Sequence, residues 1–419
     1  MSMDIKKFRI LFIGIFLVML GGFTVWSFAN PKKAFSDMEN RSLQQMPKVT
    51  KKSVFSGKFQ KKYETYLADQ IFLRDQWVNG YANMQRFLGK KEINGVYLGK
   101  NGYLIEKYEE KDFDADLETS NIARLSDFLD TVSEGLGAEH VSCLFVPSKI
   151  DILTENLPAY AEKYSGLKVA AQVKKQVEHG ERMIHLGETL SGHKKEYIYY
   201  RTDHHWTTLG AYYGFLEYQR LNGKALPDLD AYEQEIVFHD FLGTTYNKAH
   251  VRTQPDEVRL FHTDFEKVSV EGNDGEFTSD SFYFKEAALE GFDRYQIFFS
   301  KNTKKIVIKT GNKTGKTLLV VKDSFANCFV PFLAESYDEI IMVDPRYTKA
   351  KIGTIFREYK EITDVLVLFN IEKFRKDTHL SVLKLRPGDL RGDEEQNEPE
   401  KTEGDDEEDD ILDGLISLD

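Results

Sequence analysis

The sequence predicts an α/β fold in which a mainly parallel sheet is flanked by helices, and two observations predict it. Residues 141–146 (VSCLFV) form an almost continuously apolar run, as is typical of a strand buried on both faces. In the closing section, short apolar runs alternate with segments of helical periodicity. The strands expected there are 305–309, 317–321, 339–343 and 364–369, and the expected helices are 325–335 and 349–359. Strands that alternate with helices form parallel sheets with right-handed crossovers.

The elements before the closing section are predicted from local patterns. Aromatic and apolar side chains recur at helical spacing through residues 58–88. Within residues 95–105, Asn101 and Gly102 form a tight-turn signal between two apolar runs, so a hairpin is expected. Further helices are expected at 116–134, 169–179 and 207–221, and short strands at 183–186 and 197–200. Residues 228–290 are rich in aromatic side chains, Asp and Gly, and are expected to be irregular with some strands.

The N-terminus predicts a membrane segment. Lys6, Lys7 and Arg9 precede an uncharged, mostly apolar run at residues 10–29. Twenty helical residues span roughly 30 Å, the thickness of a bilayer core. The positive flank favours a cytoplasmic N-terminus and an exported remainder. A cleaved signal peptide is the alternative, because residues 27–29 resemble a cleavage site, and both interpretations export residues 31–419.

The charge of the chain is concentrated at its C-terminal end. The formal net charge is −12, whereas residues 387–419 hold 15 acidic and 2 basic residues, a net charge of −13. The rest is therefore nearly neutral, at about +1, which does not suggest a nucleic-acid-binding protein. The acidic tail has no aromatic residue and is expected to be disordered. Its apolar run at 411–418 is either an unstructured end or a short docking helix.

Two cysteines, Cys143 and Cys328, are too few for a disulfide framework. Each lies in an apolar expected strand or helix. Two buried free thiols are therefore expected.

The stretch Asp203-His204-His205-Trp206 lies on a loop between an expected strand and an expected helix. An Asp and a His two residues apart can orient one imidazole as a general base. Ser324 lies where the apolar strand 317–321 breaks into a helix, and Ser, His and Asp are the parts of an acyl-transfer triad. Both motifs follow strands, where sites of α/β proteins form.

Other interpretations of these residues remain open. Asp203 is also a suitable helix N-cap, as are Asp323 and Ser324. No metal is expected, because the adjacent side chains of His204 and His205 diverge and no second cluster has ligand spacing.

Further segments resemble those of one family. They are Glu39-Asn40-Arg41-Ser42-Leu43 with Pro47, the run 69–75 (DQIFLRD), the run 95–104 (GVYLGKNGYL), Val146-Pro147-Ser148-Lys149, Lys322-Asp323-Ser324-Phe325 and Val343-Asp344-Pro345-Arg346. With Asp203-His204-His205-Trp206, they resemble the DHHW proteins. These are similar to the alginate O-acetyltransferases, whose catalytic domain is SGNH-hydrolase-like. The resemblance covers roughly residues 35–375.

The resemblance assigns roles to the triad residues. The Asp-x-His-Trp motif of the acetyltransferases implies that Asp203 is the acid and His205 the base, with His204 at the variable position. The nucleophile falls on Ser324. The SGNH serine is commonly preceded by Gly-Asp, whereas Lys322 stands here in place of the glycine.

Substrate-binding residues are expected around the triad. The backbone N–H of Ser324 is one expected oxyanion-hole donor. Gly243 and Asn247 are suggested for the rest. Arg201 and Arg346 either orient a carboxylate or phosphate on a glycan or form structural ion pairs. Trp206 either stacks on a sugar or belongs to the core; the core is the more frequent place for a tryptophan in such a position.

The expected function is a membrane-anchored, extracytoplasmic O-acetyltransferase or esterase acting on a cell-envelope polysaccharide. The alternatives are a carbohydrate esterase that uses water as acceptor and a non-catalytic glycan-binding or assembly protein. A multi-spanning membrane protein is an expected acyl-transfer partner, and no cofactor is expected. The expected organisation is a cytoplasmic N-terminus at 1–9, a membrane segment at 10–29, a linker at 30–57, a catalytic domain at 58–386 and a tail at 387–419.

Overall fold

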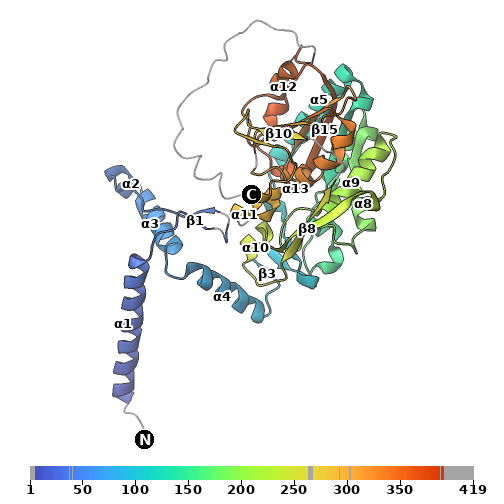
Figure 1. The fold of residues 1–419 in the computed structure, drawn as a ribbon. Helices are drawn as coiled ribbons and strands as arrows, with labels where there is room; N and C mark the ends of the chain where they lie inside the picture. Colours follow the sequence, from blue (N-terminus) through green and yellow to red (C-terminus); the bar gives the residue numbers. More distant parts are fainter. Residues whose placement is uncertain are drawn as a thin grey trace. The chain divides into compact units, whose positions relative to one another are not determined.

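The computed structural model describes residues 5–36, 38–39, 41–262, 268–291, 293–301, 303–386 and 388–390. The described chain divides into two compact units, which are considered separately (Figure 1). The N-terminal unit holds the described residues up to Lys90 together with His250–Arg252, and the large unit holds the described residues from Lys91 to Ala249 and from Thr253 onward.

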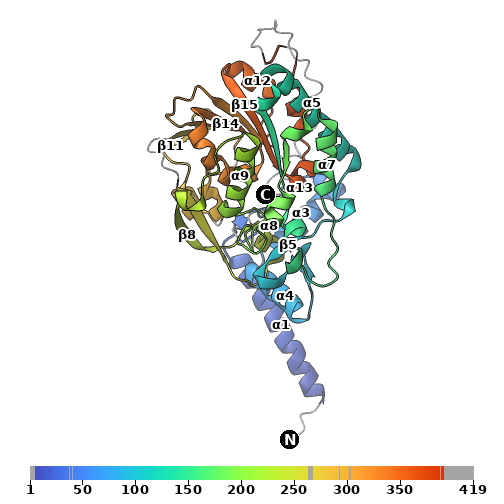
Figure 2. The same cartoon turned by 90° about the vertical axis from the view of Figure 1, so that its right-hand side faces the viewer.

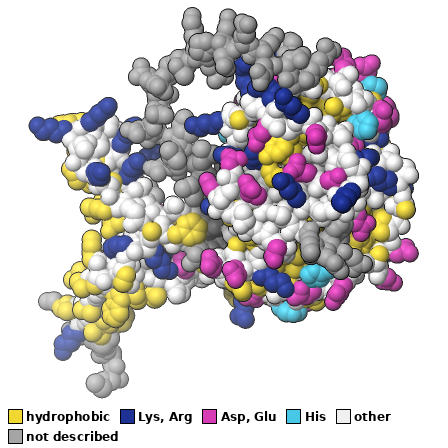
Figure 3. Space-filling view, turned by 45° about the horizontal axis from the view of Figure 1, so that its top comes forward, with side chains coloured by type: hydrophobic (Ala, Val, Ile, Leu, Met, Phe, Trp, Pro, Cys, Tyr) yellow, Lys and Arg dark blue, Asp and Glu magenta, His cyan; other side chains and the backbone are white. Residues whose placement is uncertain are grey.

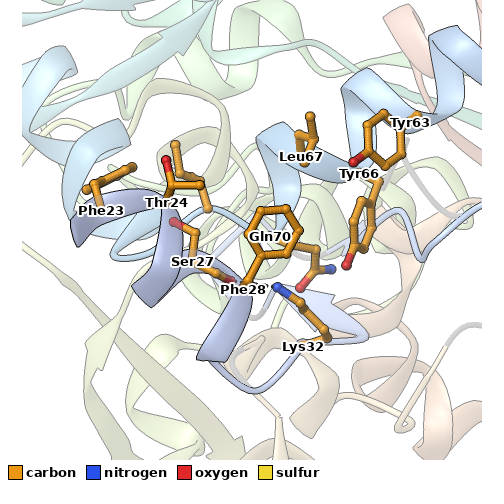
Figure 4. A pocket seen from close by; sticks show the side chains of 10 residues that line it. Phe23, Thr24, Ser27, Phe28, Lys32, Tyr63, Tyr66, Leu67 and Gln70 are labelled. Atoms are coloured by element: carbon orange, nitrogen blue, oxygen red, sulfur yellow. Dashed lines mark hydrogen bonds between the residues drawn. The ribbon is translucent and has the colours of Figure 1, made fainter. Parts of the chain in front are cut away.

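The N-terminal unit is mainly helical. Its elements are α1 (Ile5–Ala29), β1 (Phe35–Ser36), β2 (Arg41–Ser42), α2 (Lys51–Phe55), α3 (Lys58–Asp69) and α4 (Arg74–Phe87). Within α1, the segment Lys7–Ala29 is long and apolar enough to cross a membrane, and a signal sequence would have the same length and composition. Side chains from the end of α1 and from α3, among them Phe28 and Tyr66, line a mostly apolar pocket of about 690 Å³ (Figure 4).

An ion network joins three segments of the N-terminal unit. The guanidinium of Arg41 binds the carboxylate of Asp69 at 2.6 and 3.0 Å, and Arg74 Nη2 lies 2.7 Å from Glu39. Burial opposes ionisation of Glu39, but hydrogen bonds from His250 and Arg74 lower its pKa to about 2. These contacts lie partly within residues 30–57, where little regular structure was expected, and they hold the short pair β1–β2 in place.

The described residues of the large unit form an eight-stranded sheet. Its strands in spatial order are β11 (Phe277–Ser279), β10 (Ser269–Gly272), β12 (Lys305–Lys309), β14 (Glu339–Val343), β13 (Thr317–Lys322), β15 (Ile362–Asn370), β6 (Val141–Val146) and β7 (Met183–His185). The four pairings from β14 to β7 are parallel, and the three from β11 to β14 are antiparallel. The α/β class with a large, mainly parallel sheet is therefore confirmed.

Helices cover both faces of this sheet (Figure 2). Alternate residues of β13 point to opposite faces, so Leu318 belongs to one apolar cluster and Leu319 to the other. The first cluster includes side chains of α8 (Gly187–Gly192) and α9 (Thr208–Leu221). The second includes side chains of α5 (Ala115–Leu136), α7 (Leu167–Gln176), α12 (Ile352–Glu358) and α13 (Ile371–Lys376).

Smaller elements complete the large unit. They are the antiparallel sheet β3 (Glu92–Ile93), β4 (Val96–Leu98) and β5 (Leu104–Glu106), the pair β8 (Glu233–Phe241) and β9 (Asp256–His262), and the short helices α6 (Lys149–Ile152), α10 (Thr244–Ala249) and α11 (Lys285–Glu290). The turn between β4 and β5 contains Asn101 and Gly102, both with positive φ, so the predicted hairpin is confirmed.

Two expected elements differ in the structure. The helix expected at 325–335 is instead two 3₁₀ helices, η8 (Ser324–Cys328) and η9 (Val330–Ser336). Pro331 has no N–H to donate and its ring excludes a continuous α-helix, which explains the break. The strand expected at 197–200 forms only an isolated bridge between Tyr199 and Trp206.

Part of the expected acidic tail packs on the large unit. Gly388–Leu390 form a turn that packs on the large unit, and Asp389 is only 4% exposed. Its carboxylate pairs with Arg357 and accepts a hydrogen bond from the N–H of Arg386. We therefore propose that the tail begins after Leu390 rather than at residue 387; the rest of the expected tail, including the apolar run 411–418, lies outside the described residues.

Acidic and basic side chains are interspersed over the face of the large unit that is visible in Figure 3, whereas hydrophobic side chains gather along α1. Such a mixed charge distribution is typical of an ordinary protein surface rather than of a nucleic-acid-binding face.

Candidate active site

The Asp203–Trp206 loop is held by backbone hydrogen bonds on both of its sides. The Tyr200 N–H donates to the carbonyl of His205 at 3.3 Å, and the Thr207 N–H donates to the carbonyl of Ile198 at 3.0 Å. Thr207 then caps helix α9, because its hydroxyl oxygen accepts from the N–H of Gly210. The helix cap is therefore Thr207, not Asp203, which leaves the Asp203 carboxylate available to the histidine.

Asp203, His205 and Ser324 form one chain of hydrogen bonds in the interior of the large unit. Asp203 Oδ1 lies 2.6 Å from His205 Nδ1, and His205 Nε2 lies 2.7 Å from Ser324 Oγ. The exposed fractions of the three residues are 0%, 5% and 8%. The structure thus brings together the three residues predicted as a triad, and their catalytic role stays a prediction.

The second oxygen of Asp203 is fixed by Thr244. Both the N–H and the hydroxyl of Thr244 donate to Asp203 Oδ2, each at 2.9 Å. Burial would raise the pKa of Asp203, but the adjacent His205, through its imidazole and its hydrogen bonds to the carboxylate, holds it well below its ordinary value. The carboxylate is therefore ionised, and it fixes His205 Nδ1 as the protonated nitrogen.

Ser324 is placed by strand β13 and by Asp323. The strand ends at Lys322, and Asp323 Oδ1 accepts from the N–H of Phe325 while Oδ2 accepts from the N–H of Asn370. Asp323, not Ser324, is therefore the helix cap. Lys322, which replaces the usual glycine, is buried, and its Nζ lies 2.9 Å from Asn327 Oδ1.

The backbone N–H groups expected to donate to an oxyanion differ in their hydrogen-bond partners. The Ser324 N–H makes no hydrogen bond with any residue that the structure describes. The N–H of Gly243 donates to the hydroxyl of Thr202 at 3.0 Å, so it does not point at an oxyanion in this structure, and its role stays a prediction. A Cβ on Gly243 would lie 2.3 Å from the Asp203 side chain, so glycine permits this close approach. The backbone N–H of Asn247 donates to the Gly243 carbonyl, and a role for its side chain stays a prediction.

Trp206 belongs to the core, so the suggestion that it stacks on a sugar is wrong. Its side chain is fully buried, and its ring is parallel to that of Phe329 with centroids 6.2 Å apart. Its indole N–H donates to the carbonyl of Phe325 at 2.9 Å. This bond joins the histidine loop to the turn that carries Ser324.

Both arginines suggested for substrate binding make internal contacts. The Arg201 guanidinium lies 4.6 Å from the ring centroid of Tyr197, and its Nη1 is 3.9 Å from Asp256. Arg346 forms a two-point pair with the buried Asp344, at 3.0 and 2.9 Å. These contacts favour the structural interpretation of both residues.

Three further side chains hold the triad loop, and no local sequence motif marks them. The ring of Tyr295 stacks on His205, and its hydroxyl donates to the Ser324 carbonyl at 3.0 Å. Asp256 accepts hydrogen bonds from the N–H groups of Arg201 and Thr202, both at 2.7 Å. Lys149 Nζ donates to the carbonyls of Leu104, Tyr200 and Arg201.

The two histidine side chains do not diverge as expected. The ring centroids of His204 and His205 lie 3.8 Å apart, and each residue offers a ligand atom, together with Asp203, within a span of 4.8 Å. Asp203 Oδ1 and His205 Nδ1 already bond to each other. Cys143 and Cys328 are buried free thiols, as expected, and burial raises the pKa of the Cys328 thiol to about 12.

A small recess lies beside the triad, and His204 and Phe325 are among the residues that line it. Its other polar walls are Glu106, Tyr108, Ser148, Lys149 and Asn370. The space inside it holds little more than a water-sized group, far less than a pocket for a drug-sized ligand. The recess therefore suits one polar group of a larger substrate.

Comparison with known proteins finds a matching family model and one similar curated protein. The model described as "DHHW protein" matches residues 136–343. The probable alginate O-acetylase AlgJ of Pseudomonas syringae pv. tomato is 29% identical over 218 residues, which cover 49% of this chain and 50% of that protein. The chain thus aligns with about half the length of this curated relative.

Two solved structures share the fold. A DHHW family protein from Eubacterium siraeum is 23% identical, with a TM-score of 0.56 over 70% of this chain and 95% of that one. PatB1 of Bacillus cereus is 20% identical, with a TM-score of 0.57 over 68% of this chain and 98% of that one. At this identity the likenesses describe the fold alone.

Proposed function

We propose that this chain, which belongs to the DHHW protein family through residues 136–343, is an extracytoplasmic polysaccharide O-acetyltransferase with an SGNH-hydrolase-like catalytic domain. The observation that carries the proposal is the hydrogen-bonded chain from Asp203 through His205 to Ser324. The similarity to a probable alginate O-acetylase supports the reaction class and an acetylated polysaccharide as the product.

The proposed mechanism uses each of the three residues once. His205 removes the proton of Ser324 Oγ, which attacks the acetyl carbonyl, while Asp203 holds the imidazole and stabilises its charged form. The N–H of Ser324 is the proposed donor to the oxyanion. The acetyl group then passes from Ser324 to a sugar hydroxyl, and an esterase results if water is the acceptor instead.

The acetyl donor requires a partner under this proposal. Acetyl-CoA is cytoplasmic, whereas helix α1 and its basic flank predict a catalytic domain on the other side of the membrane. A multi-spanning membrane protein that hands over the acetyl group is the proposed partner. Retention of α1 as an anchor would keep the two proteins in the same membrane.

Hydrolysis of p-nitrophenyl acetate by the full-length protein in detergent tests the proposal. Ser324→Ala and His205→Ala should each lower the rate by roughly a thousandfold or more, and the double variant should be no slower, because triad residues act as a unit. Ser126→Ala, at another buried serine, is the matched control and should leave the rate unchanged. Full activity in folded Ser324→Ala would refute the assigned nucleophile.

A further inference from the structure

His204 carries one buried nitrogen without a hydrogen-bond partner among the described residues. Its Nδ1 lies 2.5 Å from the hydroxyl oxygen of Thr244, whereas its Nε2 is buried without a hydrogen-bond partner among the described residues. A buried polar atom without a partner loses the hydrogen bonds that water would give it, which costs free energy and calls for a physical explanation. The Nε2 atom belongs to a residue that lines the recess beside the triad.

The hydrogen-bond network fixes which nitrogen of His204 holds the proton. The hydroxyl of Thr244 has one proton, and it donates that proton to the ionised Asp203. Towards His204 the same oxygen is therefore an acceptor, so His204 Nδ1 carries a hydrogen. Burial and the adjacent His205 lower the pKa of His204 well below its ordinary value, so the ring is neutral. The Nε2 atom is then a bare acceptor.

The donors that line the recess are already engaged, and the hydroxyl of Ser148 donates to Asn370 Oδ1 at 3.4 Å. The three N–H groups of Lys149 go to three backbone carbonyls. The amide of Asn370 donates to the Val146 carbonyl and to Ser148 Oγ, both at 3.1 Å. The hydroxyl of Tyr108 donates to the carboxylate of Glu106 at 2.6 Å.

The hydrogen-bonding groups that remain open to a ligand in the recess are acceptors. Burial opposes ionisation of Glu106, but Lys248 and Lys373 hold its pKa below the ordinary value, so Glu106 and His204 Nε2 both present lone pairs. The positive charge of Lys149, Lys248 and Lys373 disfavours an ammonium ligand. A neutral donor fits both conditions, and the hydroxyl groups of a sugar are neutral donors.

We propose that the recess binds a hydroxyl of the acceptor that neighbours the one being acylated, and that His204 Nε2 accepts its hydrogen bond. This inference rests on the proposed acyl-transfer function. In that step the reacting hydroxyl oxygen bonds to the acyl carbon and its proton passes to His205. The bond from that carbon to Ser324 Oγ breaks, and Oγ takes the proton from His205. The reacting hydroxyl gives its only proton to His205. A hydrogen bond to His204 Nε2 therefore has to come from a second hydroxyl of the acceptor.

A pair of small acceptors of similar size tests the proposal. The full-length protein in detergent is acetylated with p-nitrophenyl acetate, with either ethane-1,2-diol or 2-methoxyethanol as acceptor, and the acetate esters formed are measured by gas chromatography. Only the diol keeps a free hydroxyl next to the reacting one. Corrected for its equivalent hydroxyls, the diol should be preferred by about 3- to 10-fold, as expected for one additional hydrogen bond.

Substitutions at His204 decide whether this nitrogen is responsible. In His204→Phe, which keeps a ring but loses the acceptor, the preference should fall to about one, whatever the total rate. In His204→Gln, whose amide oxygen can accept, part of the preference should return. His193→Phe is the control, since His193 stacks on Tyr213 outside the site, and it should keep the full preference. Equal use of both acceptors by the unaltered protein, or an unchanged preference in His204→Phe, would overturn the proposal.

The tautomer of His204 provides a readout that does not depend on turnover. In protein labelled with ¹⁵N-histidine, with the signal assigned through His204→Gln, the His204 spectrum at neutral pH should show a protonated Nδ1 and a bare Nε2. A charged ring or a protonated Nε2 would overturn the inference. The expected tautomer without any acylation of Ser324 would instead mean that the proposed function has failed.

Discussion

The imidazole of His205 lies flat against the phenol ring of Tyr295, with the ring centroids 3.8 Å apart and the planes 6° from parallel. The Tyr295 hydroxyl also donates to the backbone carbonyl of Ser324 at 3.0 Å. One side chain therefore contacts both the proposed base and the turn that carries the proposed nucleophile. Tyr295 comes from η7 (Arg294–Ile297), so a segment remote in sequence holds the site together.

Tyr295→Leu should lower kcat for p-nitrophenyl acetate by about 10-fold with little change in KM, because an aromatic stack contributes about 0.5–1.5 kcal/mol and the hydroxyl bond is lost as well. Tyr295→Phe keeps the stack and should lose less. Tyr213→Leu removes a similar stack, on His193, and is the control. Equal kcat values for Tyr295→Leu and the control would show that the stack has no positioning role.

The stability of the protein should depend on pH through Asp151. Burial raises the pKa of Asp151 to about 6, and its Oδ2 has no partner among the described residues. Between the ordinary pKa and this value the folded chain binds more protons than the unfolded chain. The stability that Asp151 contributes is therefore complete below about pH 4 and is lost as the pH rises through 6.

Asp151→Asn should remove this dependence, because asparagine is neutral throughout. Its free energy of unfolding should match that of the unaltered protein below about pH 4 and exceed it at pH 8 by a margin on the order of 3 kcal/mol, which a higher melting temperature would report. Asp127→Asn, at an exposed position on α5, should show no such trend. A constant difference between the Asp151→Asn and unaltered proteins at all pH values would contradict the assignment.

Two truncations test where the acidic tail begins. A chain ending at Leu390 should melt at the same temperature as the full chain, because the highly charged remainder has too little apolar surface to offset the entropy of ordering. A chain ending at Arg386 should melt at a lower temperature, because the buried carboxylate of Asp389 and its pair with Arg357 are lost. Identical melting of the two truncations would show that Gly388–Leu390 do not stabilise the large unit.

Membrane topology is tested with protease on intact cells, with any outer envelope opened. The basic residues before the apolar segment of α1 predict a cytoplasmic N-terminus, so the large unit should be digested from outside. A tag before Lys6 should stay protected if α1 is retained. Complete protection of the large unit would contradict an exported domain.

Local patterns predicted the parallel core of the sheet, because residues 141–146 and 339–343 are apolar enough to be strands in any arrangement. The direction of β10 and β12 was not predictable, since it depends on pairing between distant segments. The α-helix expected after Ser324 is replaced by two 3₁₀ helices because Pro331 interrupts the apolar run.

The sequence predicted the residues of the proposed triad but not the residues that contact and position them. Asp203, His205 and Ser324 could be grouped because their chemistry is complementary and their motifs follow strands. Thr244 and Tyr295 could not, because a hydroxyl or a ring that contacts the site across the fold has no local signature. The role of His204 is not predictable from the sequence, because its tautomer depends on Thr244, which lies 40 residues away in the chain.

The most direct test of the account is the covalent intermediate on Ser324. Full-length protein is mixed briefly with p-nitrophenyl acetate, quenched in acid and examined by intact mass spectrometry and peptide mapping. The account predicts one added acetyl group, located on the peptide that contains Ser324, and no addition in Ser324→Ala. An acetyl group on another residue with the same kinetics, or hydrolysis that proceeds in Ser324→Ala, would contradict it.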